Sequence, residues 1–445
     1  MLVPRMNGQE TKMRRRGGFW ATAWLVALAV VAGLSFPWDQ RTFLAKRFAN
    51  YQAVQRLGLA GYGVFDVVDL VSGAKRRWEL ARLDITPYRR YLRQLAENRT
   101  PRRETPGQAR KHVVFIQLES LDGLVLNARK DGEPLMPFLE SVAHDGVYFA
   151  NALDNTAAGR TTDGEFMVLT SQVPLVRSPV YVSESLDRIP SLPRALGAAG
   201  YRSVSLHGYH GMFWRRAKAH EDLGFDEAWF RGDLPLDERI GWGWSDRQVL
   251  QEAARRVIES DEPLFLHVIT LTNHHPYGHV GRAQGLPPVS IEEEYRRSIR
   301  YVDDCLAAFF TELENAGKSD ECLVAVFGDH DSGITSKLIT HLDEFDEPMI
   351  RDTVPLVLTG FERESRRVDD LAGLQDLPVM VLEELGLDVP VTFTGNGWEQ
   401  WGTTVGASRG PLRSRNGAVE SMTLSVDHEV LTKLALVRTD ELLMP

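Results

Sequence analysis

From His112 onward, short continuous apolar runs alternate with stretches of helical spacing, and this alternation restricts the fold more than any other feature of the chain. Runs without apolar–polar alternation are typical of parallel strands that are buried on both faces. The candidate strands are Val113–Leu118, Ser203–Leu206, Leu264–Thr270, Leu323–Phe327 and Val354–Leu358. The pattern predicts an α/β fold with a mostly parallel central sheet and helices on both faces.

The segments between the strands have the spacing of helices. Helices are expected at 136–144, 191–199, 246–260, 291–316 and 374–385. Gly200 and Gly386 each follow one of these stretches, at the position where a glycine commonly ends a helix. These elements fit the crossover connections that a parallel sheet requires.

Composition excludes one class of partner and one kind of scaffold. The 445 residues suffice for one large catalytic domain with appendages. A net charge of −10 leaves no basic surplus to neutralise phosphates, which argues against a nucleic-acid partner. The two cysteines, Cys305 and Cys322, lie among apolar residues, so we expect buried thiols rather than a bridge.

The N-terminus has the pattern of a membrane anchor. Arg14–Arg16 precede an uncharged run, Gly17–Trp38, with tryptophans near its edges. This pattern predicts a membrane-spanning helix with a cytoplasmic tail. A cleaved signal peptide is the alternative, because small residues occur at Ala27–Ala29, but the long apolar run favours a retained anchor. Either way, the chain after Asp39 is expected outside the cytoplasmic membrane, on the periplasmic or cell-surface side.

The expected organisation is a single-pass membrane protein with an extracytoplasmic catalytic domain. Its parts are a basic cytoplasmic tail (1–18), a transmembrane anchor (19–38), a juxtamembrane helical segment with a linker (39–110), the catalytic domain (111–400) and a C-terminal segment (401–445).

Residues that bind metals or phosphates follow four of the predicted strands. They are Glu119 and Ser120, His207, His274 with His275, and Asp329 with His330. In an open α/β sheet, ligands bind beyond the carboxyl ends of the strands, so these side chains are expected to meet there.

Each of these residues also has a purely structural interpretation. Glu119 could cap a helix, and Asp329 with His330 could form an internally bonded turn. Only one of the neighbours His274 and His275 is expected to face the site, and His267, inside a strand, is expected to be a core histidine. The predicted site would be absent only if all of these structural interpretations were correct at the same time.

The segment Gly159–Phe166 adds a fifth element. A glycine and an arginine precede two hydroxyls that open a predicted helix, and such a helix start suits a phosphate. Thr161 is a candidate nucleophile if a metal lowers the pKa of its hydroxyl. The alternative is that Thr161 or Thr162 only caps the helix, with Glu165 completing a capping box.

The ligand types indicate a metal. Two carboxylates, an imidazole and a threonine oxygen form a hard shell that suits Mn²⁺, with Mg²⁺ or Zn²⁺ possible. The later histidines, His341 and His428, lie in no ligand-rich setting, so one metal is expected.

Five motifs, in this order, carry a family resemblance. They are Gln117–Ser120, Gly159–Phe166, His207–Gly208 with Phe213–Arg216, Thr272–Tyr277 and Phe327–His330. From roughly 110 to 390 the chain resembles the lipoteichoic acid synthase and phosphoglycerol transferase family, within the alkaline phosphatase and sulfatase superfamily. The sulfatase branch carries Cys/Ser-x-Pro-x-Arg where this chain has Thr161–Glu165, which argues against a sulfatase.

The resemblance implies a role for each motif residue. Glu119, Thr161, Asp329 and His330 would hold the metal; Thr161 would be the nucleophile; His207, Trp214, Arg216 and His274 would contact the glycerophosphate group, and His274 would also take part in catalysis. Choosing Arg216 rather than Arg215 depends on counting from Trp214.

The implied activity moves phosphoglycerol from phosphatidylglycerol to an acceptor hydroxyl on a polyol, glycan or glycolipid. Diacylglycerol would leave, and the glycerophosphate group would pass through a covalent intermediate on Thr161. One alternative is a metal-dependent phosphodiesterase or phosphatase that uses water as the acceptor. Another is an anchored binding protein with a vestigial site.

Overall fold

The computed structural model describes residues 50–99, 111–176, 178–334, 353–398, 412–415, 418–421 and 427–443. The predicted anchor at 19–38 lies outside these residues. Among the described helices, none has the length and apolar character that crossing a bilayer requires. The chain divides into two compact units, with the boundary in the sequence between Leu83 and Asp84. The first contributes α3 (Asn50–Arg82), which leaves helical geometry at Gly58.

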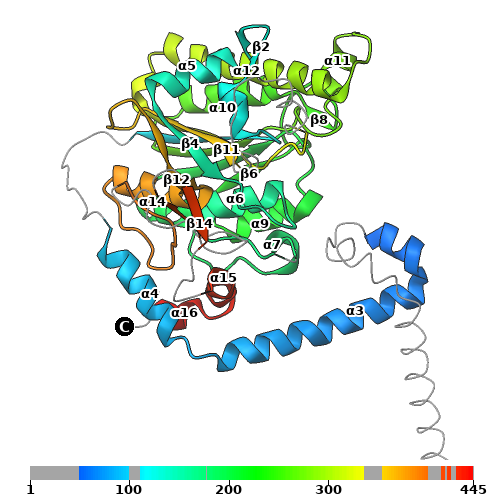
Figure 1. Cartoon of the computed structure of the whole chain (residues 1–445), viewed down its shortest axis with the longest axis vertical. Helices are drawn as coiled ribbons and strands as arrows, with labels where there is room; N and C mark the ends of the chain where they lie inside the picture. Colours follow the sequence, from blue (N-terminus) through cyan, green and yellow to red (C-terminus); the bar gives the residue numbers. More distant parts are fainter. Residues whose placement is uncertain are drawn as a thin grey trace, which may run out of the picture. The chain divides into compact units, whose positions relative to one another are not determined.

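An eight-stranded sheet forms the centre of the second unit (Figure 1). Its strand order is β12-β4-β11-β10-β1-β9-β5-β6. The bounds are β1 (His112–Leu118), β4 (Val147–Leu153), β5 (Arg202–His207), β6 (Glu227–Trp229), β9 (Leu264–Ile269), β10 (Cys322–Gly328), β11 (Thr353–Thr359) and β12 (Arg366–Gly373). Only β11 pairs antiparallel with its neighbours, β10 and β4. The prediction of a mostly parallel sheet is confirmed.

All five predicted strands are present, and β4, β6 and β12 were not predicted. Charged residues interrupt β12, and β6 has only three residues, so neither shows a continuous apolar run. Three small antiparallel pairs complete the described strands: β2 (Arg129–Lys130) with β3 (Glu133–Pro134), β7 (Arg239–Ile240) with β8 (Gly243–Trp244), and β13 (Leu412–Arg415) with β14 (Ala418–Ser421).

Helices cover both faces of the sheet, as predicted. Figure 1 shows α5, α10 and α12 on one side and α6 and α14 on the other. The helices of the second unit are α4 (Thr86–Glu97), α5 (Pro137–Asp145), α6 (Thr161–Thr170), α7 (Val180–Ser183), α8 (Leu192–Ala198), α9 (Arg216–Asp222), α10 (Asp246–Ile258), α11 (His279–Ala283), α12 (Ile291–Asn315), α14 (Leu377–Glu384), α15 (His428–Val437) and α16 (Thr439–Leu443). Short 3₁₀ turns are η3 (Gly123–Asn127), η4 (Phe213–Arg215), η5 (Ser319–Glu321) and η7 (Leu374–Asp376).

The five predicted helices are present, although the one at 374–385 is divided into η7 and α14. Gly200 and Gly386 have positive φ angles of 86° and 64° just after α8 and α14. A residue with a Cβ rarely adopts this conformation, so the two glycines end their helices as expected.

Strand β1 shows why its sequence is apolar without alternation. Val114 and Ile116 join the core formed with α10 and α12. The ring of Phe115, from the other face, lies edge-on to Phe265 and Phe327, with centroids 5.2 and 5.9 Å away. Both faces of the strand are therefore buried, which removes the polar positions that a half-exposed strand would have.

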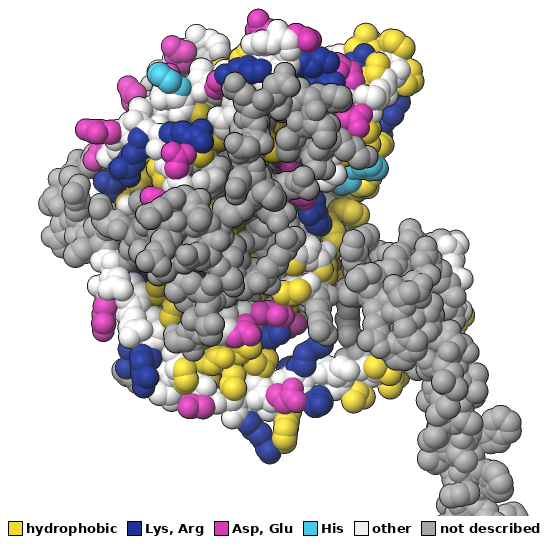
Figure 2. All heavy atoms as spheres, viewed as in Figure 1, with side chains coloured by type: hydrophobic (Ala, Val, Ile, Leu, Met, Phe, Trp, Pro, Cys, Tyr) yellow, Lys and Arg dark blue, Asp and Glu magenta, His cyan; other side chains and the backbone are white. Residues whose placement is uncertain are grey.

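Both cysteines lie in the interior of the protein. Cys305 and Cys322 are free and buried, as expected. Burial raises the pKa of each thiol to about 12, so both remain protonated at neutral pH. On the face drawn in Figure 2, acidic and basic side chains of the described residues are interspersed.

His428 makes the stability of the second unit depend on pH. The side chain is buried at the start of α15, with Nε2 3.1 Å from the Tyr91 hydroxyl. Burial lowers its pKa from 6.5 to about 4. The unfolded chain therefore binds this proton more readily, and stability is lost as pH falls from about 6.5 to about 4. The loss amounts to about 3 kcal/mol.

We expect His428→Phe to remove this loss. Urea unfolding at pH 7.5 and pH 4 should show that the wild type loses about 3 kcal/mol more than the variant between the two values. His144→Gln is the control, because the His144 side chain is 86% exposed. Equal pH dependence in wild type and His428→Phe would contradict the assignment.

Candidate active site

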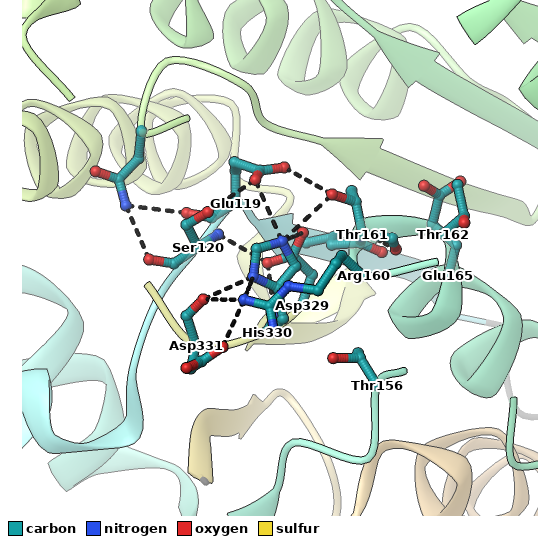
Figure 3. Close-up of polar contacts among 12 residues, drawn as sticks. Glu119, Ser120, Thr156, Arg160, Thr161, Thr162, Glu165, Asp329, His330 and Asp331 are labelled. Atoms are coloured by element: carbon teal, nitrogen blue, oxygen red, sulfur yellow. Dashed lines mark hydrogen bonds and ion pairs between the residues drawn. The ribbon is translucent and has the colours of Figure 1, made fainter. Parts of the chain in front are cut away.

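Glu119, Asp329 and His330 meet at the carboxyl ends of β1 and β10 (Figure 3). These strands are adjacent and parallel, with Leu118 beside Gly328, so the residues that follow them emerge together. All three side chains are buried, and one ligand atom from each lies within 4.8 Å of the others. The predicted meeting of these residues at the strand ends is therefore seen in the structure.

Thr161 adds a hydroxyl to this cluster. Its Oγ1 lies 3.2 Å from Glu119 Oε2 and 3.4 Å from His330 Nε2. The Thr162 hydroxyl instead donates to the Gly159 carbonyl, 3.1 Å away. Two neighbouring threonines thus have different surroundings, and only Thr161 reaches the carboxylate.

The capping interpretation of this segment is wrong. Residue Arg160, not a threonine, occupies the N-cap of α6, and its side chain makes no capping bond. Glu165 does not reach back to the cap; its carboxylate receives hydrogen bonds from Arg216 and His220.

The helix start also differs from expectation. Backbone N–H groups of Thr162, Asp163 and Gly164 already donate to the carbonyls of Gly159 and Arg160. The first turn of α6 therefore offers fewer free donors to a phosphate than the sequence suggested, although the helix dipole remains.

Asp163 and Gln117, which sequence reasoning missed, hold the Thr161 loop. Asp163 Oδ2 accepts from the backbone N–H groups of Ala157 and Gly159, at 2.8 and 2.9 Å. A Cβ at Gly159 would lie 2.2 Å from Asp163 Oδ1, so only glycine fits there. The Gln117 amide donates to the Thr161 carbonyl at 3.3 Å. An aspartate in the first turn of α6 was the available signal.

The three titratable groups of the cluster shift one another's pKa values. Burial opposes ionisation of Glu119, but the hydrogen bond and charge of His330 hold its pKa below the usual value. Burial, and then Glu119, raise the pKa of Asp329 well above normal. Burial lowers the pKa of His330, yet Asp329 and Glu119 together raise it to about 10.

This electrostatic arrangement fits a divalent cation. Asp329 Oδ2 is buried without a hydrogen-bond partner. A cation among two carboxylates, an imidazole and a hydroxyl would satisfy this oxygen and replace the protons. Within the described residues, this is the one group of three or more His, Cys, Asp or Glu ligands that could hold an ion. His341 lies outside the described residues, and His428 is bonded to Tyr91.

Neighbouring groups orient the ligands. His330 Nδ1 lies 2.7 Å from the Asp331 carbonyl and 3.0 Å from Arg160 Nη2, and Nε2 faces the cluster. The Ser120 hydroxyl donates to Glu119 Oε1, and the Ser120 N–H donates to Asp329 Oδ1, both at 2.8 Å.

His207 is a neutral hydrogen-bond acceptor. Its Nδ1 lies 3.0 Å from the Ile269 carbonyl, so this nitrogen carries the hydrogen and Nε2 can only accept. Burial, and then the charge of Arg216, lower the pKa of His207 to about 3. At neutral pH this side chain suits a hydroxyl better than an anion.

His274 and His275 differ in exposure. His274 is half-buried, its ring centroid lies 4.1 Å from that of Trp242, and it helps to lower the pKa of Glu119. His275 is exposed. His267 is a core histidine, with Nε2 3.2 Å from Gln117 Oε1.

Arg215 and Arg216 point to different environments. Arg216 is buried, whereas Arg215 is exposed and donates to the Val182 carbonyl at 3.2 Å. Trp214, just before them, is half-buried. Of the two arginines, only Arg216 belongs to the buried interior.

Sequence comparison identifies a family and several relatives. The family model described as Sulfatase matches residues 111–386. Lipoteichoic acid synthase 2 of Bacillus subtilis (strain 168) is 27% identical over 370 residues, which cover 79% of this chain and 56% of that protein. Lipoteichoic acid synthase of Staphylococcus saprophyticus is 27% identical over 371 residues, with the same shares. The chain thus spans about half the length of the curated relatives it matches.

Two solved structures share the fold. The lipoteichoic acid synthase LtaP from Listeria monocytogenes has a TM-score of 0.61 at 19% identity, covering 74% of this chain and 91% of that one. The Streptococcus pyogenes phosphoglycerol transferase GacH, in complex with sn-glycerol-1-phosphate, has a TM-score of 0.51 at 17% identity, covering 69% and 81%.

Proposed function

Because this chain belongs to the sulfatase family, we propose that it is a metal-dependent phosphoglycerol transferase of the lipoteichoic acid synthase type. The observation that carries the proposal is the Thr161 hydroxyl, 3.2 Å from Glu119 in a buried cluster of metal-ligand types. The names of the relatives, lipoteichoic acid synthases and a phosphoglycerol transferase, support the transferred group.

The reaction proceeds in two displacements on one phosphorus. Thr161 Oγ1 loses its proton and attacks the phosphorus of phosphatidylglycerol. The bond from phosphorus to the diacylglycerol oxygen breaks, that oxygen takes up a proton, and glycerophosphate remains esterified to Thr161. An acceptor hydroxyl then attacks the same phosphorus, loses its proton and restores the threonine.

Each residue of the cluster has a part in this scheme. A divalent cation, which we propose to be Mn²⁺, would lower the pKa of the Thr161 hydroxyl and withdraw charge from the phosphate. Glu119, Asp329 and His330 would hold it together with Thr161. Further charge on the phosphate is met by Arg216.

The proposed pocket combines phosphate and hydroxyl contacts. Arg216 binds phosphate oxygens, and the neutral Nε2 of His207 accepts a hydrogen bond from a glycerol hydroxyl. Trp214 and His274 complete the glycerophosphate contacts. His274 either contacts the phosphate or protonates the leaving oxygen.

The donor is a lipid, so we also propose that the enzyme acts at a membrane. The basic and apolar N-terminal segment would anchor it, with residues 111–400 on the extracytoplasmic side. The acceptor is a polyol, a glycan or a glycolipid that carries a free hydroxyl.

Release of diacylglycerol from phosphatidylglycerol vesicles with Mn²⁺ tests the proposed function. Product analysis with an added polyol or glycolipid separates transfer from hydrolysis. Acceptor-linked glycerophosphate supports the transferase, whereas free glycerophosphate alone assigns a phosphodiesterase.

Donor choice should depend on His207. We expect phosphatidylglycerol to be cleaved well, and phosphatidylethanolamine and phosphatidylcholine poorly, because their headgroups leave a polar pocket unsatisfied. His207→Ala should reduce the ratio of kcat/KM for phosphatidylglycerol to kcat/KM for the other two lipids by about tenfold, because it removes about one hydrogen bond to the headgroup. Arg216→Ala should lower kcat/KM on all three lipids, since every donor carries the phosphate. Equal use of the three lipids by the wild type would contradict a phosphoglycerol pocket.

A further inference from the structure

A buried ion cluster joins the helix that carries Thr161 to the helix that begins at Arg216. Glu165, on α6, has no exposed side-chain surface, and the side chain of Arg216 is 2% exposed. Arg216 Nε lies 3.0 Å from both Glu165 oxygens, and Nη2 lies 2.7 Å from Oε1. His220 Nε2 lies 3.0 Å from Glu165 Oε2. Four contacts therefore fix one carboxylate and one side of the guanidinium.

The Nη1 side of the Arg216 guanidinium makes no hydrogen bond. Arg216 Nη1 is buried and has no hydrogen-bond partner, which is uncommon for a buried donor. The charge of Glu119 acts on the pKa of Arg216, and the charge of Arg216 acts on the pKa of His207. The unpaired donor thus belongs to a side chain that is electrostatically linked to the metal cluster and the proposed hydroxyl contact.

The backbone that delivers Arg216 is strained. Trp214 and Arg215 have φ angles of 57° and 54°, in the left-handed region that residues with a Cβ avoid. Such a conformation is unfavourable and persists only where the surroundings impose it. The ion pair from Arg216 to Glu165 supplies such a constraint directly after the strained pair.

Glu165 also follows Thr161 by four residues on α6, which is about one helical turn. One short, wholly buried helix therefore carries both the proposed nucleophile and the anchor of the arginine. A shift of that helix would move both groups together, so their mutual spacing is preserved.

We infer that Glu165, oriented by His220, is a positioning residue for Arg216. It occupies Nε and Nη2 and thereby leaves Nη1 to donate to a non-bridging phosphate oxygen beside Thr161. The inference rests on the proposed function for the identity of the phosphate. Burial lowers the pKa of His220, so the imidazole is neutral and donates its Nε2 hydrogen to Glu165. The negative charge of Glu165 offsets the positive charge of Arg216 and does not strengthen its attraction for phosphate. Glu165 therefore acts by orienting the guanidinium group.

A double-mutant cycle with Glu165→Gln and Arg216→Ala tests the inference. Glutamine keeps the shape of the side chain but turns an amide N–H₂ toward the guanidinium. We expect each single variant to lower kcat/KM for phosphatidylglycerol by about 10²-fold, the effect of misplacing a binding group by about 1 Å. The double variant should be no slower than Arg216→Ala, because Glu165 has no role once the arginine is gone. If the losses of kcat/KM in the two single variants multiplied in the double variant, the inference would be overturned.

Thermal unfolding of the variants distinguishes a positioning role of Glu165 from a purely structural one. Glu165→Gln leaves Arg216 buried without its counter-charge, so the single variant should unfold at a lower temperature. The double variant removes both charges and should recover thermal stability but not activity. Full activity in the double variant would show that turnover needs neither Arg216 nor its positioning by Glu165.

A matched control lies on α10. Glu252 accepts from Arg255 and Arg256 at 2.7 and 2.8 Å, again one carboxylate between guanidinium groups, but the Arg255 side chain is 50% exposed. Glu252→Gln should leave kcat/KM within about twofold, the range expected of surface ion pairs. A large loss in this variant would show that removing any such carboxylate impairs the enzyme.

Calorimetric measurement of inorganic phosphate binding tests this inference independently of the proposed function. Glu165→Gln and Arg216→Ala should each weaken phosphate binding by about tenfold or more, with no further loss in the double variant. If no lipid is cleaved but this binding pattern holds, the inference stands and the proposed function falls. If phosphatidylglycerol is cleaved but Glu165→Gln binds phosphate as the wild type does, the inference falls alone.

Discussion

Thr161→Ala should abolish diacylglycerol release while leaving the fold intact. Removal of a nucleophile costs roughly 10³-fold or more in rate for covalent catalysts. The hydroxyl lies between Glu119 and His330, 3.2 and 3.4 Å away, and the small side chain makes little contribution to the core. Initial rates on phosphatidylglycerol vesicles, with circular dichroism as the measure of folding, check this expectation.

Two neighbouring hydroxyls provide the controls. Thr162 Oγ1 closes the turn to Gly159, and Ser120 Oγ donates to Glu119 Oε1. Alanine at Thr162 or Ser120 should therefore cost less than alanine at Thr161, because neither hydroxyl is the proposed attacking group. Mass spectrometry of acid-quenched enzyme should find the glycerophosphate adduct on the Thr161 peptide. A folded Thr161→Ala variant with substantial activity would refute the covalent scheme.

Loss of a single metal ligand should remove metal binding and activity together. Glu119→Ala, Asp329→Ala and His330→Ala each delete one donor of a small buried shell. Loss of outer-shell partners alone costs about 10- to 100-fold in affinity or activity, and we expect at least the upper value for these ligands. Metal content of the purified protein and rates at increasing Mn²⁺ measure the two effects.

Thermal unfolding gives a readout that is independent of turnover. Mn²⁺ should raise the unfolding temperature of the wild type, because a ligand that binds the folded state stabilises it, and should not do so for the three variants. Without metal, Asp329→Asn should keep or gain stability, since it removes a carboxyl whose pKa is raised by burial and then by Glu119. Wild-type activity in excess chelator would show that no metal is required.

Local sequence patterns determined the main strands and the residues at their ends. Val113–Leu118 and Leu323–Phe327 are apolar on both faces, so parallel pairing and burial follow from the sequence. Once those strands are parallel neighbours, the residues after them must emerge at one edge. Glu119 and Asp329 were predictable for this reason.

Only the tertiary structure decided which partner each buried polar group finds. Glu165 resembles a capping residue in sequence, yet it bonds Arg216, 51 residues away. The Gln117 amide holds the Thr161 carbonyl, 44 residues along the chain, through a contact that no local pattern encodes. Burial can be predicted from apolar periodicity along the chain. A hydrogen-bond partner depends on how separate elements pack, and burying a charge without a partner is costly.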